Sequence, residues 1–148
     1  MVGLLAYAEG DIATARKAYE AAVHANPKAL AAANNLAWIL ANTDGGDLEA
    51  ALQLAQTARS YLPDNAEVND TLGYVYYRKE MGSFAVPLFE DAILRNGNNP
   101  NFHYHLGLVY AQMGEDAKAR KALQTALKLN PRFEGAEHAR RVIASLVY

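Results

Sequence analysis

The sequence repeats itself at an interval of 34 residues. Moving the chain by that interval places seven residues on identical ones: Leu72, Gly73, Val75, Tyr76, Ala85, Ala92 and Asn96 meet Leu106, Gly107, Val109, Tyr110, Ala119, Ala126 and Asn130. A shift of 36 residues relates the preceding part of the chain to the same pattern, and the two extra residues fall in the turn from Thr43 to Asp47. A period of this length is typical of arrays in which each unit is one supersecondary structure stacked on the next.

Each unit contains an apolar stretch with helical period, a turn marked by glycine or polar residues, and an alanine-rich stretch. Alanine has the highest helix propensity, so the pattern predicts an all-α fold. We expect helices over residues 2–8, 11–25, 28–42, 47–61, 65–79, 82–95, 99–112, 115–128 and 134–146. We expect a single domain, divided into a truncated first repeat (1–27), a second repeat with a two-residue insertion (28–63), a third (64–97), a fourth (98–131) and a capping helix (132–148).

The unit from Pro100 to Phe133 resembles a tetratricopeptide repeat. It carries the family's Leu-Gly, Tyr, Gly, Ala, Ala and Pro as Leu106-Gly107, Tyr110, Gly114, Ala119, Ala126 and Pro131. The resemblance covers nearly the whole chain, although the family's first aromatic position holds Ala33, Asn69 and His103. It implies an α-solenoid of helix-turn-helix repeats that forms a right-handed superhelix, with the first helices lining the concave surface and a C-terminal capping helix.

Small residues recur where the two helices of a unit would cross. Gly73 and Gly107 belong to predicted first helices, and Ala51, Ala85 and Ala119 belong to predicted second helices. Because none of these residues has a bulky side chain, we expect the paired helices to approach closely and interlock at these positions. The small residues therefore predict packing and carry no chemistry.

Composition excludes several classes of function. The 14 basic and 16 acidic residues leave a net charge of -2, so the chain has no charge excess with which to bind nucleic acid or an anionic membrane. No stretch approaches the roughly 20 apolar residues that a membrane-spanning helix needs, so we expect no direct membrane insertion. The chain has no cysteine, which excludes disulfides, thiolate metal sites and cysteine nucleophiles.

The exposed face of each first helix can be assigned because an α-helix turns about 100° per residue. Measured from Leu72, Val75 and Tyr76 fall on the core side, and the same calculation applies from Leu36 and Leu106. By the family resemblance, the opposite faces would join into one groove. The predicted groove residues are Asn34, Asn35, Trp38, Asn42, Asp70, Tyr74, Tyr77, Arg78, Tyr104, His105, Leu108 and Gln112.

This set of residues favours a protein or peptide ligand. Side-chain amides can donate to and accept from a peptide backbone, and aromatic residues supply rigid contact area typical of binding hot spots. The alternative is that Trp38, Tyr74 and Leu108 pack along the stack and cover its seams, with the amides as ordinary solvated surface. The carboxylate clamp found in some members of the family is not expected, because Glu67 and Thr71 occupy positions that are basic there.

No pattern in the sequence indicates catalysis, a cofactor or a metal site. His103 and His105 would point about 200° apart on a helix and could not share an ion. The segment from Asp44 to Asp47 lacks the ligand spacing and the distal glutamate of a calcium loop, and is interpreted as an inserted turn. Phosphate-binding, dinucleotide-binding and serine-nucleophile motifs are absent from the sequence.

The sequence therefore predicts a non-catalytic scaffold that binds a partner peptide or helix in the concave groove. The alternative is a homo-oligomerising module, because Leu4, Leu5, Ile12 and Ala15 form an apolar face that a truncated first repeat would leave without a neighbour. RNA binding is disfavoured, since the groove carries one arginine, Arg78, against acidic residues.

The stretch from Asn34 to Glu80 is similar to bacterial tetratricopeptide proteins of the cell-envelope and exopolysaccharide type. We expect the chain to be a fragment of a longer repeat array. Its first residues contain no targeting segment, because a secretory signal needs a basic start and a longer apolar core. Location stays open: cytoplasmic by default, and periplasmic or envelope-associated if the parent is exported.

Overall fold

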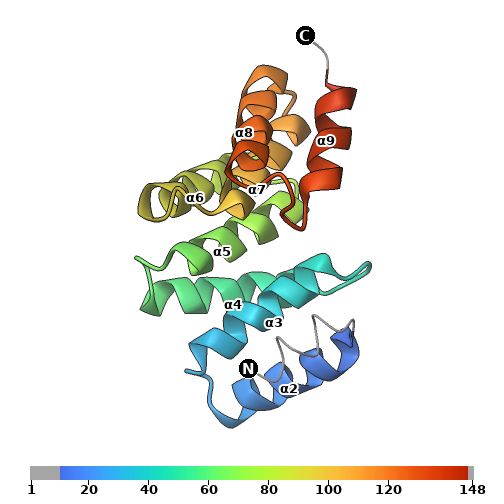
Figure 1. Ribbon diagram of the computed structural model, residues 1–148. Coiled ribbons are helices and arrows are strands. Elements are labelled where there is room, and N and C mark those ends of the chain that lie inside the picture. Colours follow the sequence, from blue (N-terminus) through green and yellow to red (C-terminus); the bar gives the residue numbers. More distant parts are fainter. Residues whose placement is uncertain (1–10, 147–148) are drawn as a thin grey trace.

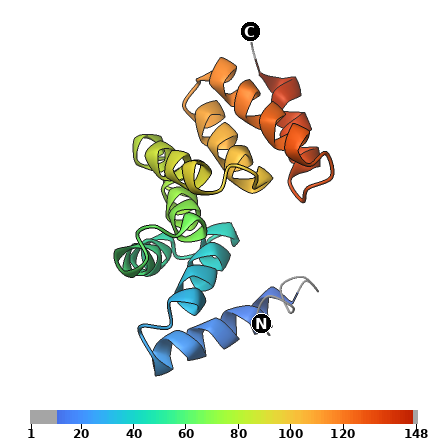
Figure 2. The ribbon, with the colours of Figure 1, turned by 60° about the vertical axis from the view of Figure 1, so that its left-hand side comes forward.

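The computed structural model describes residues 11–146, which form an α-solenoid of stacked helices and contain no strand. From α2 at one end to α9 at the other, the helices follow one another along the stack (Figures 1 and 2). Every bound lies within two residues of the predicted one, and the predicted helix over residues 2–8 lies outside the described residues. The helices are α2 (Ile12–Ala25), α3 (Leu30–Asn42), α4 (Leu48–Tyr61), α5 (Ala66–Arg78), α6 (Gly82–Arg95), α7 (Pro100–Gln112), α8 (Asp116–Leu129) and α9 (Ala136–Ser145).

Helices that follow one another in the sequence pack together, and the strongest pairings are the hairpins α3–α4, α5–α6 and α7–α8. The first helices of these hairpins also touch along one side of the stack, α3 against α5 and α5 against α7. At the C-terminal end, α9 packs against α8 and α7. No helix within residues 11–146 is both long and apolar enough to cross a membrane. The row formed by α3, α5 and α7 is the surface that the sequence predicts to carry function.

Polar residues fix where several of these helices begin. Asp47 accepts a hydrogen bond from the amide of Ala50 at the start of α4, and Asn65 accepts one from Val68 at the start of α5. At the start of α7, Asn99 accepts from the amide of Asn101, and Pro100 occupies a first-turn position where its missing N–H costs nothing. The caps define the register of the helices that carry the candidate site.

The predicted close approach of paired helices is confirmed at both glycines. A Cβ on Gly73 would lie 2.8 Å from Cε1 of Phe89, and a Cβ on Gly107 would lie 2.6 Å from Cδ2 of Leu123. Ala51, Ala85 and Ala119 are fully buried. Large side chains of the second helices therefore occupy the space that the glycines leave open.

One turn contains a backbone conformation that favours glycine but holds glutamate. Glu80, between α5 and α6, has φ of 59°, and its counterpart 34 residues later is Gly114 with φ of 78°. Because left-handed backbone is costly for a residue with a Cβ, we expect Glu80→Gly to raise the free energy of unfolding by about 0.5–1 kcal/mol. Urea unfolding followed by circular dichroism measures this change.

The matched control for that prediction is Glu90→Gly. Glu90 is also exposed but lies inside α6, where glycine should cost about 1 kcal/mol. Equal destabilisation by the two substitutions would contradict the interpretation of the Glu80 turn.

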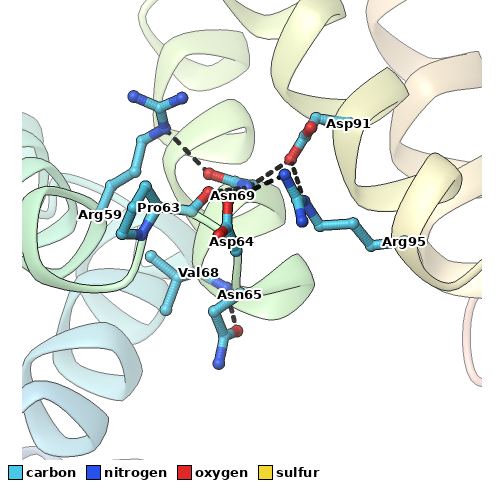
Figure 3. Close-up of polar contacts among 8 residues, drawn as sticks. All are labelled: Arg59, Pro63, Asp64, Asn65, Val68, Asn69, Asp91 and Arg95. Carbon is cyan, nitrogen blue, oxygen red and sulfur yellow. Dashed lines mark hydrogen bonds and ion pairs between the residues drawn. The ribbon is translucent and has the colours of Figure 1, made fainter.

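A polar bridge, defined as Arg59, Asn69 and Asp91, joins α4, α5 and α6 (Figure 3). Asn69 is fully buried, accepts a hydrogen bond from Nε of Arg59 at 2.9 Å and donates to Oδ2 of Asp91 at 2.6 Å. It also donates to the carbonyl of Pro63 at 3.0 Å. Asn69 occupies the position where the family pattern has an aromatic residue. Hydrogen bonds at the boundary between α4 and α6, here called a seam, therefore take the place of aromatic packing.

Candidate functional site

A cavity of about 630 Å³, here called the inner cavity, lies on the row of first helices. It extends from α2 to the segment that joins α8 to α9. Its lining residues are Tyr19, Asn34, Asn35, Trp38, Ile39, Glu67, Asp70, Thr71, Asn99, Asn101, Phe102, His105 and Glu134.

Helical spacing explains why these side chains share one surface. In α3, Asn34, Asn35 and Trp38 are separated by one residue or by three to four, and α5 and α7 repeat this spacing. Side chains at such positions lie on one helix face. Since α3, α5 and α7 pack side by side, their polar faces join into a single lining.

The floor of the cavity contains a buried ion pair between adjacent first helices. Nδ1 of His105 in α7 lies 2.8 Å from Oδ1 and 3.0 Å from Oδ2 of Asp70 in α5. The two residues are 5% and 6% exposed. Burial raises the pKa of the Asp70 carboxyl, and the nearby His105 opposes that shift. The pair joins two successive hairpins.

Aromatic rings cover this ion pair. Trp38 lies with its ring centroid 5.3 Å from that of His105 and 4.6 Å from that of Tyr74, and Tyr74 lies 5.1 Å from His105. Phe89, from the second helix α6, reaches the same histidine at 5.8 Å. We call Trp38, Tyr74, Phe89 and His105 the aromatic cluster. It draws on three hairpins and shields the buried charges from water.

One amide in the lining has an unmet hydrogen-bonding capacity. Oδ1 of Asn34 is buried and has no hydrogen-bond partner among the described residues. Buried polar atoms without partners are rare and costly in folded proteins. Because Asn34 lines the inner cavity, a ligand donor that reached this oxygen would satisfy it.

The charge of the lining has one sign. Glu67 and Glu134 are exposed at the inner cavity, and Asp70 lies at its floor. Within the described part of the chain, none of its lining residues is lysine or arginine. The cavity therefore combines acidic groups with amides, and its one histidine is already engaged by Asp70.

The structure brings together five of the twelve predicted groove residues in this lining: Asn34, Asn35, Trp38, Asp70 and His105. The other seven lie elsewhere on the stack: Asn42, Tyr74, Tyr77, Arg78, Tyr104, Leu108 and Gln112. Arg78 is exposed at the end of α5. The cavity lining thus extends along α5 only as far as Thr71 and along α7 only as far as His105, whereas the predicted site continued to Arg78 and Gln112.

Several residues expected to face outward are instead engaged or buried. Asp70, His105 and Leu108 are buried, because neighbouring inner helices cover a face that a single helix would expose. Asn42 donates to the carbonyl of Trp38 and accepts from the hydroxyl of Tyr74 at 3.0 Å. Gln112 donates to the carbonyl of Tyr77 at 3.1 Å. In the structure Leu108 is buried in the stack and the Tyr74 hydroxyl donates to Asn42 of the neighbouring inner helix.

The remaining tyrosines contribute to packing more than to the cavity. Burial raises the pKa of Tyr77, and burial is also the main cause that raises the pKa of Tyr104 to about 12. The Tyr104 hydroxyl lies 2.5 Å from Nδ1 of His138 in α9, and its ring meets Phe133 edge-on. Tyr104 therefore attaches α9 to the stack.

Eight lining residues lie outside the predicted set: Tyr19, Ile39, Glu67, Thr71, Asn99, Asn101, Phe102 and Glu134. A signal for one of them was available. Asn101 lies one turn before His105, just as Glu67 lies one turn before Thr71, so continuing the predicted rows toward the helix starts would have found it. Glu134 could not be found this way, because it lies outside the helices.

The two histidines of α7 serve different partners. Nε2 of His103 donates to the carbonyl of Gly97 at 2.9 Å, whereas His105 contacts Asp70. No group of three or more histidine, aspartate or glutamate side chains within residues 11–146 is arranged to hold a metal ion. The inner cavity can therefore bind a ligand through hydrogen bonds to its amides and attraction to its carboxylates.

Comparison with known proteins points to one family. A tetratricopeptide repeat model matches residues 2–66 and a second matches residues 100–133, so together they cover more than half of the chain. The general transcriptional corepressor ssn6 of Schizosaccharomyces pombe is 30% identical over 135 residues. That match spans 90% of this chain but only 12% of ssn6.

Solved structures share the same fold. TTC0263, a thermophilic TPR protein of Thermus thermophilus, superimposes with a TM-score of 0.81 at 27% identity, over 97% of this chain and 77% of that one. A crystal structure of MamA superimposes with a TM-score of 0.71 at 25% identity, over 97% of this chain and 75% of that one.

Proposed function

Because this chain belongs to the tetratricopeptide repeat family, whose fold is a general and usually non-catalytic scaffold for protein interactions, we propose that it binds an extended segment of a partner protein in the inner cavity. The observation that carries the proposal is the cavity of about 630 Å³, lined by four asparagines. Their amides can pair with both the N–H and the C=O groups of a peptide backbone. The chain itself would perform no catalysis.

The charge of the cavity supports a partner segment that carries lysine or arginine. Glu67 and Glu134 are exposed at its edge, and a basic side chain between them would gain attraction without meeting a like charge. The unpartnered Oδ1 of Asn34 would accept a hydrogen bond from the same segment. An amide-rich acidic cavity is a poor site for an acidic peptide or for a nucleic-acid backbone.

A displayed library of random peptides tests this proposal. Segments of about 12 residues can reach about 40 Å when extended, enough to cross several inner helices. Selection on the immobilised chain should enrich peptides with lysine or arginine, and their binding should weaken as salt is raised.

Two matched variants locate the site. The cavity variant combines Asn35→Ala, Glu67→Lys and Asn101→Ala, and should weaken selected peptides by at least about tenfold. The control variant makes the same kinds of change outside the cavity, with Gln53→Ala, Glu90→Lys and Gln124→Ala, and should bind normally. Failure to enrich basic peptides, undiminished binding of those peptides to the cavity variant, or loss of their binding only in the control variant would reject the proposal.

Self-association is the second candidate function. Ile12 in α2 is 42% exposed, and among the described helices α2 packs only against α3. Of the other residues in the expected apolar face, Ala15 is fully buried, and Leu4 and Leu5 lie outside the described residues. Sedimentation equilibrium over a wide concentration range distinguishes the two: a mass that stays monomeric removes this candidate.

The proposed setting is an assembly in a bacterial cell. A bacterial source is suggested by the solved structures of similar fold, of which TTC0263 is from Thermus thermophilus. The similarity to repeat proteins of the cell envelope supports a place there as the more specific proposal. We propose the same division into repeats as the sequence predicted, with α3–α4, α5–α6 and α7–α8 as three complete units.

A further inference from the structure

A second cavity lies on a different surface of the stack, between the second helices α6 and α8. Its volume is about 550 Å³, and we call it the outer seam groove. It shares no lining residue with the inner cavity. Its lining residues are Glu90, Ile93 and Leu94 of α6, His103, Leu106 and Tyr110 of α7, and Lys118, Lys121, Ala122 and Thr125 of α8.

The preceding seam of the same stack has different side chains at the equivalent positions. Between α4 and α6 the polar bridge crosses the seam, with Asn69 held between Arg59 and Asp91 (Figure 3). Thirty-four residues later, Ile93 stands for Arg59 and Thr125 stands for Asp91. The bridge therefore cannot form between α6 and α8, although the seam has the same helical framework.

One hydrogen bond of Asn69 recurs at the equivalent position and shows that the two seams have the same framework. His103, the counterpart of Asn69, donates to the carbonyl of Gly97, just as Asn69 donates to the carbonyl of Pro63. The side chain at this position is thus fixed to its own loop in both seams. Only the two partners across the seam are lost, because isoleucine and threonine, which cannot form the bridge, take their places.

An apolar side chain beside the missing bridge faces solvent. Leu94, whose counterpart in the preceding unit is Ser60, is 84% exposed. Ile93 and Tyr110 are partly buried beside it and continue the apolar wall into the groove. Single exposed apolar residues are common, but an exposed leucine at the edge of an apolar groove marks an interaction surface.

The charged edges of the groove indicate which partner fits. Lys118 and Lys121 lie on the α8 side, one helical turn apart, and Glu90 lies alone on the α6 side. The ammonium of Lys118 sits 5.6 Å from the centre of the Tyr110 ring, at the border between the apolar wall and the basic edge. A partner would therefore place apolar side chains against Leu94 and Ile93 and a carboxylate beside Lys121.

We propose that the outer seam groove binds an amphipathic helix of a partner protein, with acidic residues flanking its apolar face. A helix suits a groove bounded by two helices, because ridges of side chains fit between the rows of α6 and α8. The chain then has two binding surfaces of opposite preference: an acidic inner cavity and a basic-edged outer groove. One molecule can hold two different partners at once.

A displayed library of helical peptides of about 16 residues, which span about 24 Å, tests the proposal. Peptides selected on the chain should have an apolar face and an excess of glutamate or aspartate. Their binding, measured by fluorescence anisotropy, should fall at least about tenfold with Leu94→Asp or Lys121→Glu. Leu129→Asp is the matched control. Leu129 lies on α8 and is exposed, as Leu94 is on α6, but it does not line the groove.

A gain-of-bridge variant provides the sharpest test. Ile93→Arg, His103→Asn and Thr125→Asp together reproduce the side chains that close the preceding seam, and should abolish peptide binding while the protein stays folded. The inner-cavity variant Asn35→Ala, Glu67→Lys and Asn101→Ala should leave it unchanged. Undiminished binding to the gain-of-bridge variant, selection of basic peptides whose binding Leu94→Asp abolishes, or a dimer that Leu94→Asp dissociates would each overturn the proposal.

Discussion

His105→Ala is expected to lower the free energy of unfolding by about 3–5 kcal/mol at neutral pH, because it leaves Asp70 as an uncompensated buried charge. The histidine ring also contacts Trp38 and Phe89, so its removal opens space inside the aromatic cluster. Urea unfolding followed by far-ultraviolet circular dichroism measures the loss.

The pH dependence of that loss has a definite sign. Burial already raises the pKa of Asp70, and removal of His105 takes away an influence that lowers it. A carboxyl with a raised folded-state pKa is favourable when protonated and costs stability as the pH rises through that pKa. The deficit of the His105→Ala variant should therefore shrink as the pH is lowered.

His103→Ala is the matched control for His105→Ala. Both histidines lie in α7, but His103 is less buried and its contact is a single hydrogen bond to the carbonyl of Gly97. Its loss should cost about 1 kcal/mol. A second control replaces both members of the pair, with Asp70→Leu and His105→Met, and should recover most of the stability. Equal losses for the two histidines would show that the ion pair is not a stabilising contact.

Phe89→Ala is expected to cost about 3–5 kcal/mol as a large-to-small change in a packed core. Phe89 is fully buried, occupies the space that Gly73 leaves open and touches the ring of His105. Its removal would therefore disturb the α5–α6 hairpin and the floor of the inner cavity together. The same urea titration gives the magnitude.

Phe84→Ala removes the same side chain from the same helix at an exposed position. Phe84 is 57% exposed and stacks on Tyr76 at 5.4 Å. Truncation there should cost about 1 kcal/mol or less. If Phe84→Ala were as damaging as Phe89→Ala, the assignment of the core between α5 and α6 would be wrong.

The fold could be predicted from the sequence because its determinants are local and repeated. Gly73 and Gly107 mark close crossings, and the helices are separated by short turns whose residues recur with the period. In a solenoid each unit packs on its neighbours, so one correct unit predicts the rest. The inserted turn was also predictable. The sequence could not show why Gly46 is needed there, which is that a Cβ at this position would meet the carbonyl oxygen of Leu40.

The candidate site was harder to predict because a helical wheel shows which way a side chain points but not which side chain of a neighbouring helix it contacts. The wheel placed Asp70 and His105 on the inner face, where they do lie, but could not show that the two side chains meet each other across 35 residues. It also could not show that Asn42 and Gln112 would be engaged by neighbouring inner helices. Such contacts depend on how far successive repeats rotate, which no single helix encodes.

The aromatic cluster changes how an array of this kind should come apart. A stack held only by adjacent units can lose its repeats one at a time from either end. Trp38 and His105, however, belong to α3 and α7, and their rings meet with Tyr74 of α5 between them. The aromatic cluster thereby links three hairpins. Opening the central hairpin would expose the aromatic cluster to water. The three hairpins should therefore unfold as one cooperative unit, while the ends of the array unfold more easily.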